Sequence, residues 1–118
     1  MDYQKLQADI MNIDSKIRLV TICDINGKVM SSDHRQGVKN LLSTEESKES
    51  LELAANSWKI RSKLTSKIGK GKYVLAEYEK IKRITMPLGD NHLLYVTTEP
   101  EADHSNIINR IRNLESGL

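Results

Sequence analysis

The chain of 118 residues contains no phenylalanine, a single cysteine and only two prolines. One cysteine excludes an intramolecular disulfide, which favours a reducing compartment and predicts a cytoplasmic location. The longest apolar runs are only four or five residues, such as Leu93 to Val96, so we expect no membrane insertion. The first residues show no basic segment followed by an apolar block, so no secretory signal is predicted.

Aromatic side chains are scarce as well, with only Trp58 and four tyrosines in the whole chain. The core must therefore be built from leucine, isoleucine, valine and methionine. Few rings also disfavour proteins that stack nucleic-acid bases on an aromatic platform. With 38% hydrophobic and 29% charged residues, the composition is that of a globular domain rather than a disordered or fibrous chain. We expect residues 1–118 to form one domain, because neither a linker nor a repeat interrupts them.

Apolar periodicity predicts eight elements, three of them helices. Asn26-Gly27 between two strand-like runs is a strong hairpin signal, because both turn positions favour a positive φ. Pro87 is expected to end a strand, since proline cannot donate to a β-ladder. The predicted helices cover 2–15, 43–67 and about 103–114, and the predicted strands cover 18–24, 29–32, 72–79, 81–86 and 92–98. Short connections imply antiparallel neighbours, so the predicted fold is α+β, a single five-stranded antiparallel sheet with helices on its faces, in the order α-β-β-α-β-β-β-α.

The middle helix is apolar over more than half of its circumference, whereas a helix lying on one sheet needs an apolar face of roughly 100°. One face is bulky and aliphatic, and we expect it to lie against the sheet; it comprises Leu53, Ile60, Leu64 and Ile68. A second face combines Leu51, Ala54, Ala55 and Trp58, with Arg61 at its margin. A tryptophan among small residues beside an arginine is typical of protein–protein contacts. We therefore predict a homodimer contact there, although the first helix covering this face is an alternative.

Basic residues are concentrated in the middle of the chain. Residues 58–84 carry nine basic and two acidic side chains, a net +7, whereas 1–57 carry a net −2 and 85–118 a net −3. The predicted partner-binding patch consists of Lys59, Lys63, Lys67, Lys70, Lys72, Lys80, Lys82 and Arg83. Such a patch could bind an acidic protein surface or nucleic-acid phosphates, or it could simply be a solvated face whose lysines protect an edge strand.

The catalytic and metal-binding patterns that we sought are missing. Cys23 lies in an apolar strand beside Asp24, an environment that does not lower the pKa of a thiol. The three histidines have no second ligand at metal-binding spacing. Gly69 to Lys72 is too short for a phosphate-binding loop, which needs four residues between its glycines. We expect no enzyme, no cofactor and no metal site.

Two segments resemble a known family. The stretch Val20 to Ser32 resembles the first hairpin of the roadblock/dynein light chain family, and Ile84 to Val96 resembles its last hairpin. The resemblance extends to the tail Glu99 to His104 and the isoleucine helix after it. It implies a profilin-like fold and a non-enzymatic, usually dimeric module that regulates or scaffolds small GTPases and motor-associated complexes.

In that family the middle helix and the following edge strand form the dimer contact. This implies that Tyr73, Leu75 and Tyr78 join the predicted interface. The GTPase would be the acidic partner of the basic patch. Two alternatives remain open at this point, a nucleic-acid-binding protein that uses 59–83 and a small-ligand sensor domain.

Overall fold

The computed structural model describes residues 2–117 as one five-stranded sheet with helices on both of its faces. The helices are α1 (Tyr3–Met11), α2 (Thr44–Ser62), α3 (Thr65–Ile68) and α4 (His104–Ser116). The strands are β1 (Ile17–Asp24), β2 (Val29–His34), β3 (Val74–Glu77), β4 (Lys82–Leu88) and β5 (His92–Thr98). The predicted α+β class and element order are confirmed, with the short α3 as an addition.

The strands pair antiparallel throughout, in the spatial order β2-β1-β5-β4-β3. The β1–β2 hairpin turns where the sequence predicts, and Gly27 has the positive φ of 90° that this turn requires. The expectation that Pro87 ends its strand is wrong, because β4 continues to Leu88. The β3 ladder on that side stops at the Val74–Thr85 pair, so the missing N–H of Pro87 interrupts no pairing with β3.

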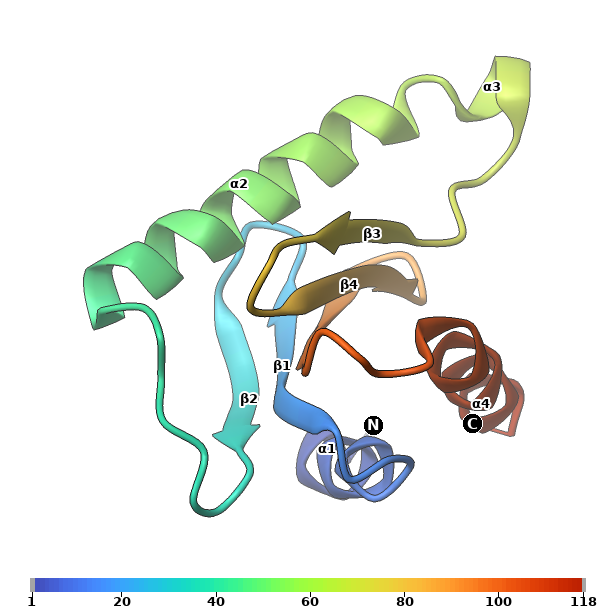
Figure 1. Cartoon of the computed structure of the whole chain (residues 1–118). Helices are drawn as coiled ribbons and strands as arrows, with labels where there is room; N and C mark the ends of the chain where they lie inside the picture. Colours follow the sequence, from blue (N-terminus) through green and yellow to red (C-terminus); the bar gives the residue numbers. More distant parts are fainter. Residues whose placement is uncertain (1, 118) are drawn as a thin grey trace.

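Figure 1 shows α1 and α4 on one face of the sheet and α2 on the other. The main core lies between the sheet and the α1–α4 layer, where Ile10, Ile22 and Ile111 have no exposed surface. Alternate residues of the strands reach this core, as expected for a half-covered antiparallel sheet. The core is aliphatic, as expected for a chain without phenylalanine.

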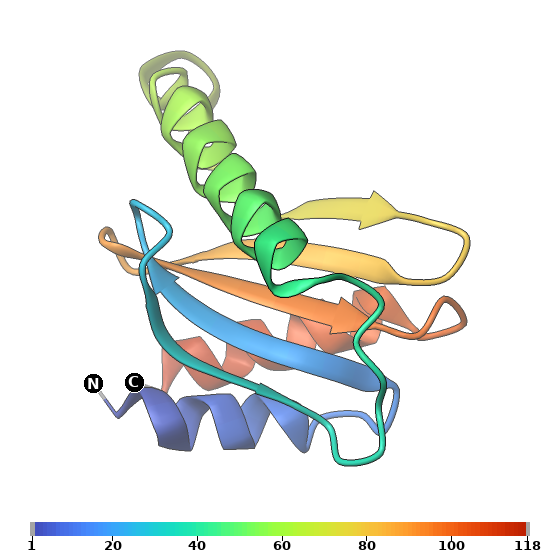
Figure 2. The same ribbon diagram turned by 90° about the vertical axis from the view of Figure 1, so that its left-hand side faces the viewer.

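The α2 helix lies across the opposite face, and Figure 2 shows it crossing the strands on the far side from α1 and α4. Ser43 begins it with a capping box: its hydroxyl accepts from the Glu46 N–H, and the Glu46 carboxylate accepts from the Ser43 N–H. These hydrogen bonds hold the pKa of Glu46 below its ordinary value. The helix ends at Ser62, earlier than predicted, and Gly69 follows the short α3.

Candidate protein-interaction surface

The face of α2 that lies on the sheet is the tryptophan face. Ala55 and Trp58 are 2% and 7% exposed and pack in a small cluster with Cys23 and Leu93. Gly71 lies so close that an added Cβ would be 3.2 Å from the Trp58 ring. Small residues beside one large ring let the helix approach the sheet closely, and the ring packs beneath it against the strands. The prediction that the aliphatic face meets the sheet is therefore wrong.

The aliphatic face is left outside. Leu53, Ile60, Leu64 and Ile68 are 67%, 54%, 47% and 78% exposed. We call these four residues the aliphatic stripe. Scattered surface leucines need no explanation, but here four bulky apolar side chains are exposed along one stretch of chain, two on α2, one in the turn after it and one on α3, and a monomer rarely presents so many to water.

The edge of the sheet lies beside this helix. β3 is the last strand of the sheet and pairs only with β4, so one side of its backbone has no strand neighbour. Tyr73 and Tyr78 flank it and are 47% and 54% exposed. A groove of about 160 Å³ between α2 and β3 is lined by Leu53, Trp58 and Tyr78 among others. Leu53, at one end of the aliphatic stripe, and the flank of the open β3 edge thus line one groove.

The eight residues predicted for the dimer contact fall into three groups. Arg61, Tyr73 and Tyr78 are exposed, whereas Leu51, Ala54 and Leu75 are half-buried. Ala55 and Trp58 are buried within the chain and offer little area to a partner. Sequence reasoning did not name the exposed aliphatic stripe as a candidate contact, although the same periodicity had marked it as apolar.

Charge is segregated along the same helix. Residues 44–55 carry four acidic side chains and one basic side chain, a net −3, whereas 56–68 carry four basic side chains and no acidic one, a net +4. Glu49 precedes Leu53 by four residues and lies beside it on α2, whereas Lys67 lies on α3 next to Ile68. Both are exposed. The apolar surface therefore has an acidic end and a basic end.

Most of the predicted basic patch is at the surface. Lys59, Lys63, Lys67, Lys70, Lys72 and Lys80 are exposed, and Lys59 donates to the Asn26 side chain. Lys82 does not belong to the patch, because its side chain is turned inward and only 7% exposed. Its ammonium lies 3.0 Å from both Ala102 O and His104 Nδ1 and 3.7 Å from a Glu77 carboxylate oxygen. Arg83 is half-buried next to the rings of Tyr78 and Tyr95.

The residues that could carry chemistry lie apart. Burial, with a smaller effect from the adjacent Asp24 carboxylate, raises the pKa of the Cys23 thiol to about 11, which opposes the formation of a thiolate nucleophile. His92 Nε2 forms a hydrogen bond with the Tyr3 hydroxyl at 2.9 Å, and His104 contacts Lys82. Within 2–117, His, Cys, Asp and Glu side chains nowhere gather in groups of three that could hold a metal ion. No helix of this range is long and apolar enough to span a membrane.

No known protein family matches the sequence, and no curated protein does either. Solved structures do match. A Roadblock/LC7 domain from Streptomyces avermitilis superposes with a TM-score of 0.77 at 15% identity, over 99% of this chain and 94% of that one. The chain has the roadblock fold. The resemblance predicted from the two hairpins is confirmed at this level.

Other roadblock-like structures agree with this assignment. MglB from Myxococcus xanthus gives a TM-score of 0.74 at 16% identity, covering 98% of this chain and 93% of that one. The gliding protein MglB from Thermus thermophilus gives 0.76 at 12% identity, covering 96% and 82%. Profilin IA from Acanthamoeba castellanii is more distant, with a TM-score of 0.60 at 9% identity and 94% of each chain covered. At these identities the roadblock fold is what the comparisons establish.

Proposed function

We propose that the protein is a non-enzymatic, homodimeric interaction module that regulates or scaffolds a small GTPase. The observation that carries the proposal is the aliphatic stripe beside the open edge of β3. Both features are completed by a second copy of the chain: burying the stripe removes apolar area from water, and pairing two β3 edges satisfies backbone groups.

The charges of α2 favour one orientation for this dimer. A two-fold axis makes the contact between identical surfaces, and the two helices run antiparallel when that axis is perpendicular to α2. The acidic start of one helix then lies beside the basic end of the other, and Glu49 of one protomer approaches Lys67 of its partner. A parallel arrangement would instead bring like charges together. The segregated charges therefore support self-association in the antiparallel sense.

A charge-swap experiment tests this arrangement. Glu49→Lys and Lys67→Glu should each weaken the dimer in sedimentation equilibrium, because each places like charges across the contact. The double variant restores opposite charges and should recover most of the wild-type dissociation constant. Lys48→Glu serves as a matched control, since Lys48 is exposed on α2 but lies about 140° around the helix from Leu53, away from the proposed contact. A double variant as weak as the sum of the two single variants would contradict the antiparallel contact.

The GTPase is implied by the roadblock resemblance, and the exposed lysines of the α2–β3 connection supply a surface for an acidic partner. Gly69 to Lys72 is exposed throughout and contains Lys70 and Lys72. Two MglB proteins are among the matching structures, one of them described as a gliding protein. A regulator of this kind recognises one nucleotide state of its GTPase better than the other, because only differential affinity shifts an equilibrium.

The test is capture from the native cell extract loaded with GDP or with a non-hydrolysable GTP analogue, followed by mass spectrometry. We expect a GTPase whose recovery depends on the nucleotide, survives nuclease treatment and falls in Lys70→Glu/Lys72→Glu. A nucleic-acid-binding protein would behave differently: its affinity would fall with salt with a log–log slope of about −0.9 for each duplex phosphate contacted. Tight duplex binding at physiological salt, without any nucleotide-dependent GTPase, would overturn the proposal.

A further inference from the structure

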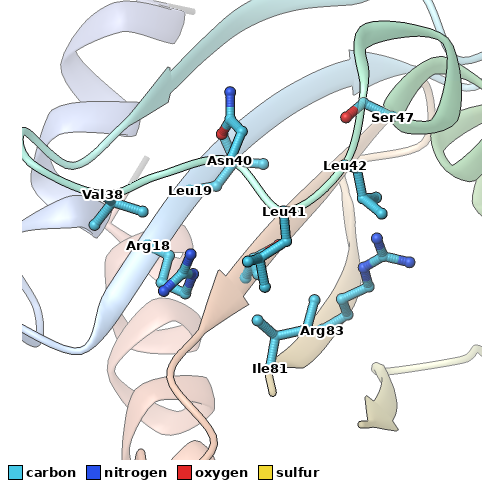
Figure 3. Close-up of a pocket in the computed structure, with 10 residues that line it drawn as sticks. Arg18, Leu19, Val38, Asn40, Leu41, Leu42, Ser47, Ile81 and Arg83 are labelled. Carbon is cyan, nitrogen blue, oxygen red and sulfur yellow. The ribbon is translucent and has the colours of Figure 1, made fainter. Parts of the chain in front are cut away.

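One part of the α2 side of the sheet is not covered by α2. The cluster beneath the helix gathers around Cys23, Trp58 and Leu93, at the end of the sheet near the β1–β2 turn. At the opposite end, where β1 begins and β5 finishes, the connection between β2 and α2 passes over the strands instead. A cavity of about 50 Å³ lies under this connection and is lined by Arg18, Leu19, Leu41, Leu42, Ile81 and Arg83 among others (Figure 3).

The cavity opens into a wider groove of about 680 Å³ between α2 and the β3–β4 turn. Four residues line both spaces: Leu41, Leu42, Ile81 and Arg83. Three of them are aliphatic, and the fourth carries a positive charge. A largely apolar hollow with one convergent polar group is the usual form of a small-molecule site.

The Arg83 side chain lines the cavity without a hydrogen-bonding partner from the described residues. Within 2–117 its side chain makes no hydrogen bond and no ion pair, and its Nε is shielded from solvent. The guanidinium carbon lies 5.4 Å from the centre of the Tyr78 ring and 5.7 Å from that of Tyr95, so the two rings hold the group in place. Figure 3 shows the side chain reaching from β4 toward Leu42. The shielded Nε is out of reach of a ligand, but the terminal nitrogens of this half-buried guanidinium have no acceptor among the described residues and can bind one from outside the chain.

Arg18, in the same cavity, shows the contrast. Its guanidinium donates to the Glu99 carboxylate at 2.6 Å and to the Lys39 carbonyl at 2.8 Å. Arg18 therefore ties the connection between β2 and α2 to the sheet, and its guanidinium is already hydrogen-bonded to Glu99 and Lys39. Arg83 is the arginine of this cavity that remains available to a ligand.

We propose that this cavity binds a small monocarboxylate with a branched or short aliphatic body. The carboxylate accepts from the planar guanidinium of Arg83, which matches its geometry with two parallel hydrogen bonds. The aliphatic body contacts Leu41, Leu42 and Ile81. This site goes beyond the proposed function, and its outer groove shares Glu49, Leu53 and Tyr78 with the proposed dimer surface.

Size and charge restrict the ligand further. A volume of about 50 Å³ corresponds to roughly four water molecules, so the closed part holds a carboxylate and its first carbons. The wider groove outside is lined by Glu46, Glu49 and Glu79 and, besides Arg83, by Lys80, so negative charges outnumber positive ones there. A second negative charge on the ligand would meet these carboxylates, so the site favours a monoanion over a dicarboxylate or a nucleotide.

The experiment titrates the full-length ¹⁵N-labelled protein with isobutyrate and follows the arginine Nε–H signals by NMR. Isobutyramide and isobutylamine serve as uncharged and cationic counterparts of nearly the same shape. We expect isobutyrate to shift the Arg83 Nε–H signal in a saturable way and the two counterparts to bind at least tenfold more weakly. Succinate should also bind more weakly than isobutyrate. The Arg83 signal is assigned by its loss in Arg83→Lys.

Substitutions supply a second arm. Arg83→Gln should weaken isobutyrate binding at least tenfold, as measured from the backbone NMR signals of Leu41 and Leu42. Arg112→Gln, at an exposed position of α4, should leave the binding unchanged. Equal shifts from isobutyrate and isobutyramide would overturn the proposal, and so would a wild-type Arg83 signal that does not respond to isobutyrate. Because the wild-type titrations decide these points, the test stands even if Arg83→Gln fails to fold.

Discussion

Ile60→Glu separates the stability of the protomer from the stability of the proposed dimer. Ile60 belongs to the aliphatic stripe and is 54% exposed in a single chain. Replacing an exposed helical residue away from caps and buried contacts usually changes the free energy of unfolding by less than about 0.5 kcal/mol. The protomer should therefore fold as the wild type does. The proposed contact, in contrast, buries this side chain.

The size of the effect follows from the exposed fraction. Fully burying an isoleucine side chain contributes about 1.5–3 kcal/mol, so the exposed half of Ile60 contributes about 0.8–1.6 kcal/mol in each protomer. Two-fold symmetry places the residue in the contact twice, which gives about 1.6–3.2 kcal/mol for the dimer. At 1.4 kcal/mol per factor of ten, the dissociation constant should rise by about 15- to 200-fold. A carboxylate removed from water adds to this loss.

The assay is sedimentation velocity over a range of concentrations, together with thermal unfolding followed by circular dichroism. The matched control is Val29→Glu, because Val29 is 47% exposed but lies on β2, at the opposite edge of the sheet. We expect Val29→Glu to leave the dissociation constant unchanged. Two results would refute the reasoning: a wild-type protein that stays monomeric at high micromolar concentration, or equal weakening by the two glutamate substitutions.

Three further predictions concern groups inside the protomer. Trp58→Ala should lower the free energy of unfolding by about 3 kcal/mol in urea denaturation, because the ring is the largest buried group beneath α2. The Cys23 thiol should react slowly with a disulfide reagent unless the chain is unfolded. Its pKa in the folded chain, about 11, exceeds the ordinary value of 9.0, so the thiol of the unfolded chain loses its proton first. The free energy of unfolding should therefore fall as the pH rises from 9.0 toward 11. Lys82→Met should lower the free energy of unfolding by about 1–3 kcal/mol in the same denaturation assay, since the buried Ala102 carbonyl and the half-buried His104 ring lose their donor, whereas Lys80→Met at an exposed position should be nearly neutral.

The strands and hairpins could be predicted because their signals are local. Asn26-Gly27 determines its turn through two adjacent residues, and the β5 prediction matches the observed His92–Thr98. The β1–β2 pairing and the end helix follow from similarly short patterns, and the element order then implies the antiparallel sheet. The prediction that Pro87 ends its strand was wrong because the effect of a proline on pairing depends on where the neighbouring strand β3 stops beside β4, which is not a local property.

The site was predicted less well, since its residues depend on which way a side chain turns. Lys82 belongs to the basic segment by sequence, yet the carbonyl of Ala102 and the ring of His104 draw it inward across a separation of about twenty residues. No property of the segment around Lys82 signals those two acceptors. The sequence likewise does not reveal that Arg83 lacks a hydrogen-bonding partner, because that depends on the whole fold.

The two apolar faces of α2 show a deeper reason for the error. Periodicity identified both faces, but ranking them by bulk assigned the aliphatic face to the sheet. A sheet face carrying Cys23 and Leu93 leaves a shallow space, and one indole ring with small neighbours fills it better than a row of branched chains does. The aliphatic stripe remains exposed outside, and the proposed dimer would bury it against a partner. One apolar face of α2 thus holds the helix on the sheet, and the other is the face that we propose for self-association.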